Sequence, residues 1–314
     1  MPSLAAIRAS NAAFAHSSTY TPVAVFVGGT SGIGEGMVRT FAENTGGKSN
    51  IVIVGRNRGA ADRILDSLPK PSSDGDKKFT REFVQCDATL MKNVQNATQE
   101  ILSRHPKINY LIMSPGFATL SGRDETPEGI DKKLAVHYYA RWKFTYDLLP
   151  ALTKAKDSDE KVAAMSVLGA GNGGTILEDD LHLKKNYSIS NAAAAAQAYS
   201  DMMIESFSER APGLTFIHSS PGFVRTAIGA SSPSTALRWS MKVLGPLTRP
   251  FSVSADECSQ YMWHAIYSTA NKPGPWRIGP SGEDLEKKNY VGSDKQRKLV
   301  WDHTEEVINS ALAM

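Results

Sequence analysis

The stretch VAVFVGGTSGIGEGM, residues 23–37, decides the fold class of this chain. A short apolar run leads into a turn that contains Gly28, Gly29, Gly32 and Gly34, and a helix-length segment follows. Glycine lets the backbone adopt tight-turn dihedrals and approach a ligand closely. The N-terminus of a helix offers free N–H groups and a partial positive charge to phosphate. A strand, a glycine-rich turn and a helix in this order predict a site for a dinucleotide pyrophosphate.

The rest of the chain repeats the alternation of strand and helix. Short, unalternating apolar runs predict buried strands at 23–28, 51–55, 82–86, 108–113, 161–166 and 214–219. The segments between them predict helices near 33–44, 58–68, 89–104, 127–153 and 188–210. Repeated strand–helix units indicate one α/β domain, a Rossmann-type doubly wound parallel sheet with helices on both faces.

Two segments fall outside this pattern. Residues 1–20 are expected to form an N-terminal extension, and 21–314 the nucleotide-binding domain. A looser segment near 225–255 carries Arg225 and Arg238, and no acidic residue lies between Glu209 and Asp256. We expect a substrate lid there. One interpretation is an ordinary lid whose charges are solvated. The other is a lid that prefers anionic or amphiphilic ligands, or that touches a membrane surface.

Composition excludes several classes of protein. The 314 residues carry a net charge of only +3, and no basic run indicates nucleic acid. The two cysteines, Cys86 and Cys258, lie in no metal-binding pattern, so we expect no metal and a reducing compartment. No apolar run is long enough to span a membrane. These features favour the cytoplasm, with mitochondrial import as an alternative because no acidic residue precedes Glu35.

The end of the second predicted strand indicates which dinucleotide binds. An NAD-binding fold usually places Asp or Glu there, to bind the ribose hydroxyls. This chain has Gly55 followed by Arg56. A guanidinium suits a 2′-phosphate, so the sequence predicts NADP(H). In the glycine turn, the residues expected to contact the cofactor are Gly28, Thr30, Ser31, Gly32, Ile33 and Gly34.

Six motifs together resemble the short-chain dehydrogenase/reductase family, and the resemblance covers nearly the whole chain after residue 20. They are GGTSGIG (28–34), CDAT (86–89), MSPG (113–116), AMSVLG (164–169), YSISN (187–191) and SPGFVRT (220–226). The long insert between the fourth and fifth of these motifs resembles that of retinol-dehydrogenase-like members. The N-terminal motifs resemble uncharacterised fungal members.

The resemblance implies roles for individual residues. It implies contacts of Asp87 with the adenine and of Ser114 and Gly116 with the cofactor. The segment that would line the nicotinamide holds Pro221, Gly222, Val224 and Thr226. Ser166 would polarise a substrate carbonyl, and Tyr187 would exchange the proton.

Two positions depart from the family pattern. His137 stands where the family has an asparagine on the helix that ends LLP, and Asn191 stands where it has a lysine. The resemblance therefore implies a catalytic set of Ser166, Tyr187, Asn191 and His137, with Tyr187 and Asn191 also contacting the cofactor. Without the lysine, Tyr187 should titrate near the ordinary tyrosine value of about 10 and remain protonated. His137 is either a proton relay or a satisfied core histidine.

Protonation of Tyr187 favours carbonyl reduction over alcohol oxidation, because reduction needs an acid. The sequence therefore predicts an NADPH-dependent reductase of a ketone, aldehyde or enone, a small-molecule substrate. One alternative is a non-redox proton-transfer enzyme, such as an isomerase, dehydratase or cyclase. Another is a catalytically inactive NADP(H)-binding protein. A homodimer is possible, since the family often pairs subunits through the helices near 127–153 and 188–210.

Overall fold

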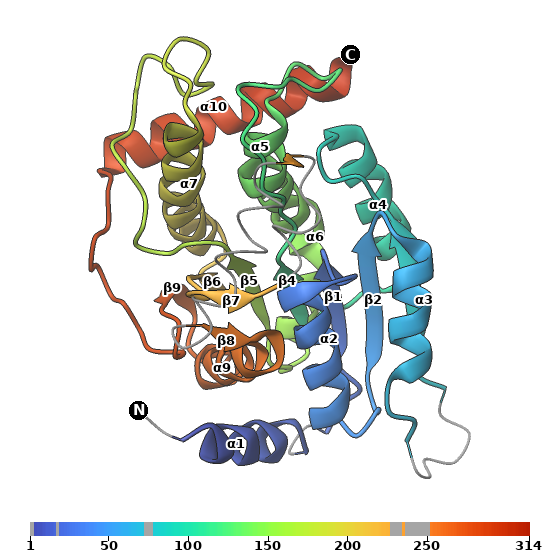
Figure 1. The fold of residues 1–314 in the computed structure, drawn as a ribbon. Helices are drawn as coiled ribbons and strands as arrows, with labels where there is room; N and C mark the ends of the chain where they lie inside the picture. The colour runs from blue at the N-terminus through green and yellow to red at the C-terminus, as the bar shows by residue number, and fades with distance from the viewer. Residues whose placement is uncertain (1–2, 17–18, 72–77, 227–233, 236–251) are drawn as a thin grey trace.

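The structure is a computed structural model that describes residues 3–16, 19–71, 78–226, 234–235 and 252–314. Its centre is a parallel sheet of seven strands (Figure 1). In spatial order these are β3 (Arg81–Gln85), β2 (Asn50–Gly55), β1 (Val23–Val27), β4 (Tyr110–Met113), β5 (Ala163–Val167), β6 (Thr215–Ser219) and β9 (Gly274–Ile278). The six expected strands are confirmed, and β9 is an additional one.

Helices cover both faces of the sheet, as expected for a single doubly wound domain. One face carries α4 (Met91–Arg104), α6 (Ala140–Asp157) and α7 (Ile189–Arg210), and the other carries α2 (Gly32–Asn44), α3 (Arg58–Ser67) and α9 (Ala255–Thr269). Neighbouring residues of β1 pack on different faces of the sheet. Val25 packs in the hydrophobic core beneath α4, α6 and α7, the first core. Ala24 and Phe26 pack in the core beneath α2, α3 and α9, the second core. Burial on both faces explains why the strands are apolar without alternation.

The chain order reverses between β1 and β4, which pair in the middle of the sheet. In open parallel sheets, ligands bind in the crevice outside the carboxyl ends of the strands at such a switch point. The crevice here receives the loops that follow β1, β2, β3 and β4, and the glycine turn is one of them.

Two further helices lie outside these layers. The N-terminal segment forms α1 (Leu4–His16), which packs along α9, where the Asn11 side-chain amide donates to the Gln260 carbonyl at 2.9 Å. The expected division at residue 20 stays a prediction. The C-terminal α10 (Asp294–Ala313) packs across the outer side of α7 and inserts Trp301, which is 4% exposed, into the first core (Figure 1).

The helix expected over 127–153 is a composite. It starts as α5 (Lys132–Leu134), passes through a π-helical turn, η1 (Ala135–Tyr139), and continues as α6. Asp131 sets the start, because its carboxylate accepts hydrogen bonds from the backbone N–H groups of Lys133 and Leu134. Single π-helical turns inside α-helices occur frequently at functional sites.

Of the expected lid, only residues 225–226, 234–235 and 252–255 are described. The short strands β7 (Val224–Arg225) and β8 (Val253–Ser254) pair in parallel beside α9. Residues 227–233 and 236–251, where most of the predicted lid falls, lie outside the described residues.

Candidate active site and nucleotide pocket

The glycine turn after β1 packs more closely than side chains would allow. Gly28 has a φ of 84°, and a Cβ there would lie 2.7 Å from the backbone nitrogen of Pro115. A Cβ at Gly34 would lie 2.3 Å from the Gly28 carbonyl oxygen and 2.6 Å from Ser114 Oγ. Backbone atoms of the glycine turn therefore lie in close contact with the first turn of α2 and with the loop after β4. Such close contact requires glycine, because a Cβ would clash.

The N-terminus of α2 is open to a ligand. Ser31 is the N-cap residue, and its side chain makes no capping hydrogen bond. The first N–H groups of a helix need a partner, and an anion supplies one. Gly32 follows with a φ of 59°, and a Cβ there would lie 3.3 Å from the Thr226 side chain. Thr226 therefore lies beside the helix N-terminus.

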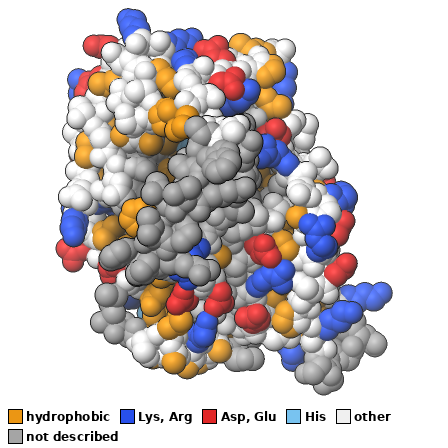
Figure 2. Space-filling model, viewed as in Figure 1, with side chains coloured by type: hydrophobic (Ala, Val, Ile, Leu, Met, Phe, Trp, Pro, Cys, Tyr) orange, Lys and Arg blue, Asp and Glu red, His pale blue; other side chains and the backbone are white. Residues whose placement is uncertain are grey.

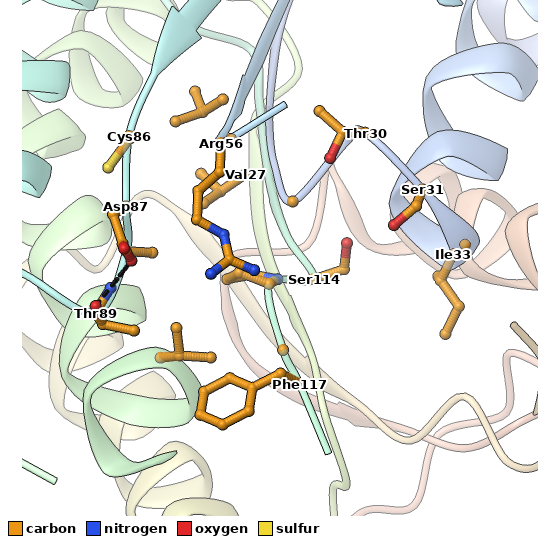
Figure 3. A pocket seen from close by; sticks show the side chains of 18 of the residues that line it. Val27, Thr30, Ser31, Ile33, Arg56, Cys86, Asp87, Thr89, Ser114 and Phe117 are labelled. Carbon is orange, nitrogen blue, oxygen red and sulfur yellow. Dashed lines mark hydrogen bonds between the residues drawn. The ribbon is translucent and has the colours of Figure 1, made fainter. Parts of the chain in front are cut away.

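A pocket opens at the carboxyl ends of β1 to β4 (Figure 3). It gathers the following predicted cofactor residues: Gly28, Thr30, Ser31, Gly32, Ile33, Arg56, Asp87, Ser114, Gly116 and Thr226. Gly34 packs directly behind the turn, against Gly28 and Ser114. Phe117 and Val136 also line the pocket and were not predicted.

Arg56 and Asp87 define one end of the pocket. Figure 3 shows the Arg56 side chain reaching into the pocket from the end of β2. Asp87 follows β3, and its Oδ1 accepts from the Thr89 backbone nitrogen at 3.0 Å and the Thr89 hydroxyl at 2.8 Å. A second pocket continues past both residues and includes Asn93. Arg58, two residues after Arg56, places its guanidinium 4.8 Å from the centre of the Phe83 ring.

The pocket fits a dinucleotide on two structural grounds. Ser114 Oγ is buried and has no hydrogen-bond partner among the described residues. A buried polar atom without a partner is costly, so a ligand atom there would stabilise it. The second ground is the backbone cradle of Gly28, Gly32 and Gly34 at the open end of α2.

Ser166 lies on β5 beneath this edge and is 1% exposed. Its hydroxyl oxygen accepts a hydrogen bond of 2.7 Å from Nη1 of Arg141, on α6. Arg141 is also 1% exposed and donates to the carbonyls of Val167 at 2.8 Å and Pro115 at 2.7 Å. Burial lowers the pKa of Arg141 to about 9, so the side chain is still a cation at neutral pH.

His137 lies on η1, next to the pocket residue Val136. Its ring stacks on Phe117 with 5.9 Å between ring centres. Burial, followed by the nearby charges of Arg141 and Lys133, lowers the pKa of His137 to about 3. The imidazole is therefore neutral at physiological pH.

Tyr187 precedes α7, and Ser188 caps that helix by accepting from the Asn191 backbone nitrogen at 3.0 Å. The Tyr187 hydroxyl accepts a hydrogen bond of 2.8 Å from Nζ of Lys133. Burial, followed by the carboxylate of Asp131, raises the pKa of Tyr187 to about 12. The phenol is therefore protonated at neutral pH. The Asn191 side chain is exposed, and its amide donates to the Asn186 carbonyl at 2.8 Å.

The structure brings the predicted residues together in three groups. Ten of the predicted cofactor residues line the pocket, Ser166 is held by Arg141, and Tyr187 is held by Lys133. Apart from Gly34, the predicted cofactor contacts that are not part of the pocket lining are Tyr187, Asn191, Pro221, Gly222 and Val224. Pro221, Gly222 and Val224 follow β6 in the segment that leads to Thr226. Sequence reasoning missed Lys133 and Arg141. Their spacing of four residues on either side of His137 is the signal that could have found them.

Other kinds of site are not seen in the described part of the chain. There, no group of three or more metal-ligating side chains could hold an ion. No described helix is both long and apolar enough to cross a membrane. On the face in Figure 2, basic and acidic side chains are interspersed rather than gathered by sign. The absence of a nucleic-acid partner stays a prediction.

Comparison with known proteins agrees with this geometry. The family model described as short chain dehydrogenase matches residues 22–235. Oxidoreductase AN1596 of Emericella nidulans is 33% identical, over 99% of this chain and 99% of its own length. Oxidoreductase andH of Emericella variicolor is 33% identical, over 87% of this chain and 77% of its own length.

Solved structures share the fold at low sequence identity. The NADPH-bound carbonyl reductase from chicken fatty liver superposes with a TM-score of 0.60 at 17% identity. The superposition covers 84% of this chain and 98% of that one.

Proposed function

The chain belongs to the short-chain dehydrogenase family, and we propose that it is an NADPH-dependent reductase of a ketone, aldehyde or enone. Two relatives that match most of the chain are named oxidoreductases. The observation that carries the proposal is the pocket in which a glycine cradle, the unpartnered Ser114 hydroxyl and Arg56 meet.

The preference for NADPH rests on charge at the end of β2. Gly55 offers no carboxylate for the ribose hydroxyls, and the Arg56 guanidinium lines the pocket. Arginine binds phosphate through two parallel donors, which suits a 2′-phosphate. The backbone of Gly28 and the N-terminus of α2 would hold the pyrophosphate, and Thr226 would lie near the nicotinamide.

The bound nicotinamide supplies the hydride, and the protein supplies orientation and the proton. Tyr187 is the proposed acid, because its raised pKa keeps the phenol protonated. Ser166 is the proposed donor to the carbonyl oxygen. Since Arg141 donates to Ser166 Oγ, the serine hydrogen is left to point elsewhere, and a substrate oxygen could accept it.

A second candidate is proton-transfer chemistry without redox change. The neutral imidazole of His137 beside the pocket favours it, because it can both accept and donate a proton. Such an enzyme would isomerise, dehydrate or cyclise its substrate without consuming nucleotide. The third possibility, an inactive NADP(H)-binding protein, would bind nucleotide and convert nothing.

The experiment that separates these functions starts with a fluorescence titration of the protein with NADPH and NADH. A panel of ketones, aldehydes and enones is then incubated with the protein and NADPH, and nucleotide oxidation and product formation are both measured. Reduction requires stoichiometric loss of NADPH. Product without nucleotide loss would indicate proton transfer. Failure to bind either nucleotide would contradict the cofactor assignment.

We propose the cytoplasm as the location, because both cysteines are buried free thiols, as expected in a reducing compartment. A homodimer also stays a prediction. The α10 helix occupies the outer side of α7, so subunits could not pair through that side of α7 without displacing α10.

A further inference from the structure

The composite helix α5–η1–α6 carries a row of basic side chains. Lys133, His137 and Arg141 are spaced four residues apart along it. The outer two make hydrogen bonds to the two proposed catalytic hydroxyls, those of Tyr187 and Ser166. Position 191 on α7, by contrast, is an uncharged asparagine whose amide is bound to the Asn186 carbonyl. Positive charge therefore reaches Tyr187 from a different helix.

Lys133 is 7% exposed, and its ammonium makes three hydrogen bonds. Nζ lies 2.9 Å from the Ser121 carbonyl, 3.0 Å from the Gly122 carbonyl and 2.8 Å from Tyr187 Oη. An ammonium has three hydrogens and no acceptor, so all its donors are used. The phenolic oxygen of Tyr187 must be the acceptor, and its own hydrogen must point away from Lys133. That hydrogen is shared with the Asp131 carboxylate, with which the phenol is hydrogen-bonded.

The other charged groups near Tyr187 come from the segment before α5. Asp131 and Asp124 raise the tyrosine pKa, and Arg123 lowers it. Arg123 forms an ion pair with Glu125 at 2.7 Å. Asp131 is engaged by backbone N–H groups, including that of Lys133. Lys133 is therefore the cation in direct contact with the phenolic oxygen.

The backbone around Tyr187 is anchored from the other side. The Asp180 carboxylate accepts hydrogen bonds from the backbone nitrogens of Lys184, Lys185 and Asn186, at 2.8, 3.0 and 2.8 Å. These hydrogen bonds, together with the one from the Asn191 amide to the Asn186 carbonyl, hold the backbone of Asn186, the residue before Tyr187, in place. The Tyr187 phenol therefore contacts Lys133 from a backbone that is held in place. Val136, three residues after Lys133 on the same composite helix, lines the pocket.

We propose that Lys133 is the positioning cation of Tyr187, replacing from α5 the charge that position 191 lacks. The inference rests on the proposed function in taking Tyr187 as the acid. When the carbonyl is reduced, the Tyr187 O–H bond breaks and a new O–H bond forms at the alkoxide oxygen. The phenolate left behind is stabilised by the adjacent ammonium, and Tyr187 regains its proton from solvent.

A direct test titrates residue 187 without nucleotide or substrate. A fluorotyrosine is placed at position 187 of the full chain, since fluorination lowers the phenol pKa into the range where the fold is stable. The titration is followed by fluorine NMR. Lys133→Met should raise the pKa of residue 187 by about one to two pH units, because an adjacent cation is lost. Lys133→Arg should retain most of the wild-type value.

Lys154→Met is the control, because it removes the same charge from an exposed side chain at the far end of the same composite helix. It should leave the titration nearly unchanged. If Lys133→Met does not fold, Lys133→Gln gives the same readout and keeps an amide donor for the loop carbonyls. An unchanged pKa in the folded variant would overturn the proposal, as would an equal shift in Lys154→Met.

Kinetics separate this inference from the proposed function. In an active reductase, Lys133→Met should lower kcat by about 10²-fold, the lower range for general acid catalysis, with little change in the KM for nucleotide. In the protein with fluorotyrosine at position 187, Lys133→Met should move the alkaline limb of kcat to higher pH, which a purely structural defect would not cause. A titration shift without carbonyl reduction in wild type would refute the function and retain the Lys133–Tyr187 coupling. Reduction by the fluorotyrosine protein whose alkaline limb is the same with and without Lys133→Met would refute the inference alone.

Discussion

Nη1 of Arg141 donates a hydrogen bond of 2.7 Å to Oγ of Ser166, and both side chains are 1% exposed. The guanidinium also donates to the carbonyls of Met113, Pro115 and Val167. Met113 is the last residue of β4, Pro115 follows it closely, and Val167 is the last residue of β5. Arg141 therefore connects the ends of the two strands beneath the proposed active site. In the direct hydrogen bond Ser166 acts as the acceptor, and it gives a buried cation part of its solvation.

Ser166→Ala should therefore affect both stability and catalysis. Removing the hydroxyl leaves an Arg141 donor unpaired, which should lower the free energy of unfolding by ~1–3 kcal/mol. Loss of a donor to the carbonyl oxygen should lower kcat by ~10²–10³-fold. Urea denaturation and steady-state kinetics measure the two effects.

Ser219→Ala is the matched control for that experiment. Ser219 lies on the neighbouring strand β6, is fully buried, and its Oγ has no partner among the described residues. Its removal should leave stability unchanged or raise it, because an unsatisfied polar group is lost. Equal destabilisation by both variants would contradict a specific role for the Arg141–Ser166 bond.

Arg56→Ala should weaken NADPH binding selectively. A charge-assisted hydrogen bond contributes about 1.5–3 kcal/mol, so the Kd for NADPH should rise by about 10-fold to 100-fold. The Kd for NADH should change little, since NADH lacks the 2′-phosphate. Arg58→Ala is the control, because the Arg58 guanidinium stacks on Phe83. A comparable loss of NADH binding in Arg56→Ala would contradict recognition of the 2′-phosphate.

Trp301→Ala should show how far α10 contributes to the fold. The Trp301 ring lies 5.0 Å from that of Trp142 and 5.1 Å from that of Phe207, and the Arg210 guanidinium lies 3.6 Å from its centre. Truncation of a buried tryptophan should lower the free energy of unfolding by about 3–5 kcal/mol. Urea denaturation measures this. Lys298→Ala, an exposed change on the same helix, should cost little.

The sheet and the pocket at its switch point could be predicted from sequence because their signals are local. The glycine turn follows β1 directly, and Arg56 follows β2 directly. Because the two strands are parallel, their carboxyl ends lie at the same edge of the sheet, and the turn and Arg56 lie there together. The strand β9 escaped prediction because it is an edge strand that contains Pro275 and Arg277. Such a strand shows no continuous apolar run, and proline is tolerated at edges. The buried Arg277 is paired with Asp201 at 3.1 Å.

The cations of the candidate active site could not be predicted from local signals. Lys133 and Tyr187 are 54 positions apart, and a lysine beside Lys132 looks like part of a solvated helix start. Arg141 sits among aromatic residues of a helix, and nothing local reveals its contact with Ser166 on β5. The sequence showed that position 191 lacks a charge. The arrangement of α5 and α7 in space was needed to find another cation at Tyr187.

His137 should make the protein sensitive to acid. Burial and the neighbouring cations lower its pKa in the folded state to about 3, whereas an unfolded histidine titrates near 6.5. Protonation therefore favours the unfolded state. The stability contributed by neutral His137 is nearly complete above about pH 6.5 and falls by about 1.4 kcal/mol per pH unit below it. Between about pH 6.5 and pH 5 the expected loss is about 2 kcal/mol.

Urea denaturation at a series of pH values measures this dependence, and His137→Gln tests its origin. Glutamine does not titrate, so the variant should lose less stability on acidification than wild type. Its stability at neutral pH is compared separately, because the stacking on Phe117 is also changed. An equal slope in wild type and His137→Gln would show that His137 is protonated as readily in the folded chain as in the unfolded one.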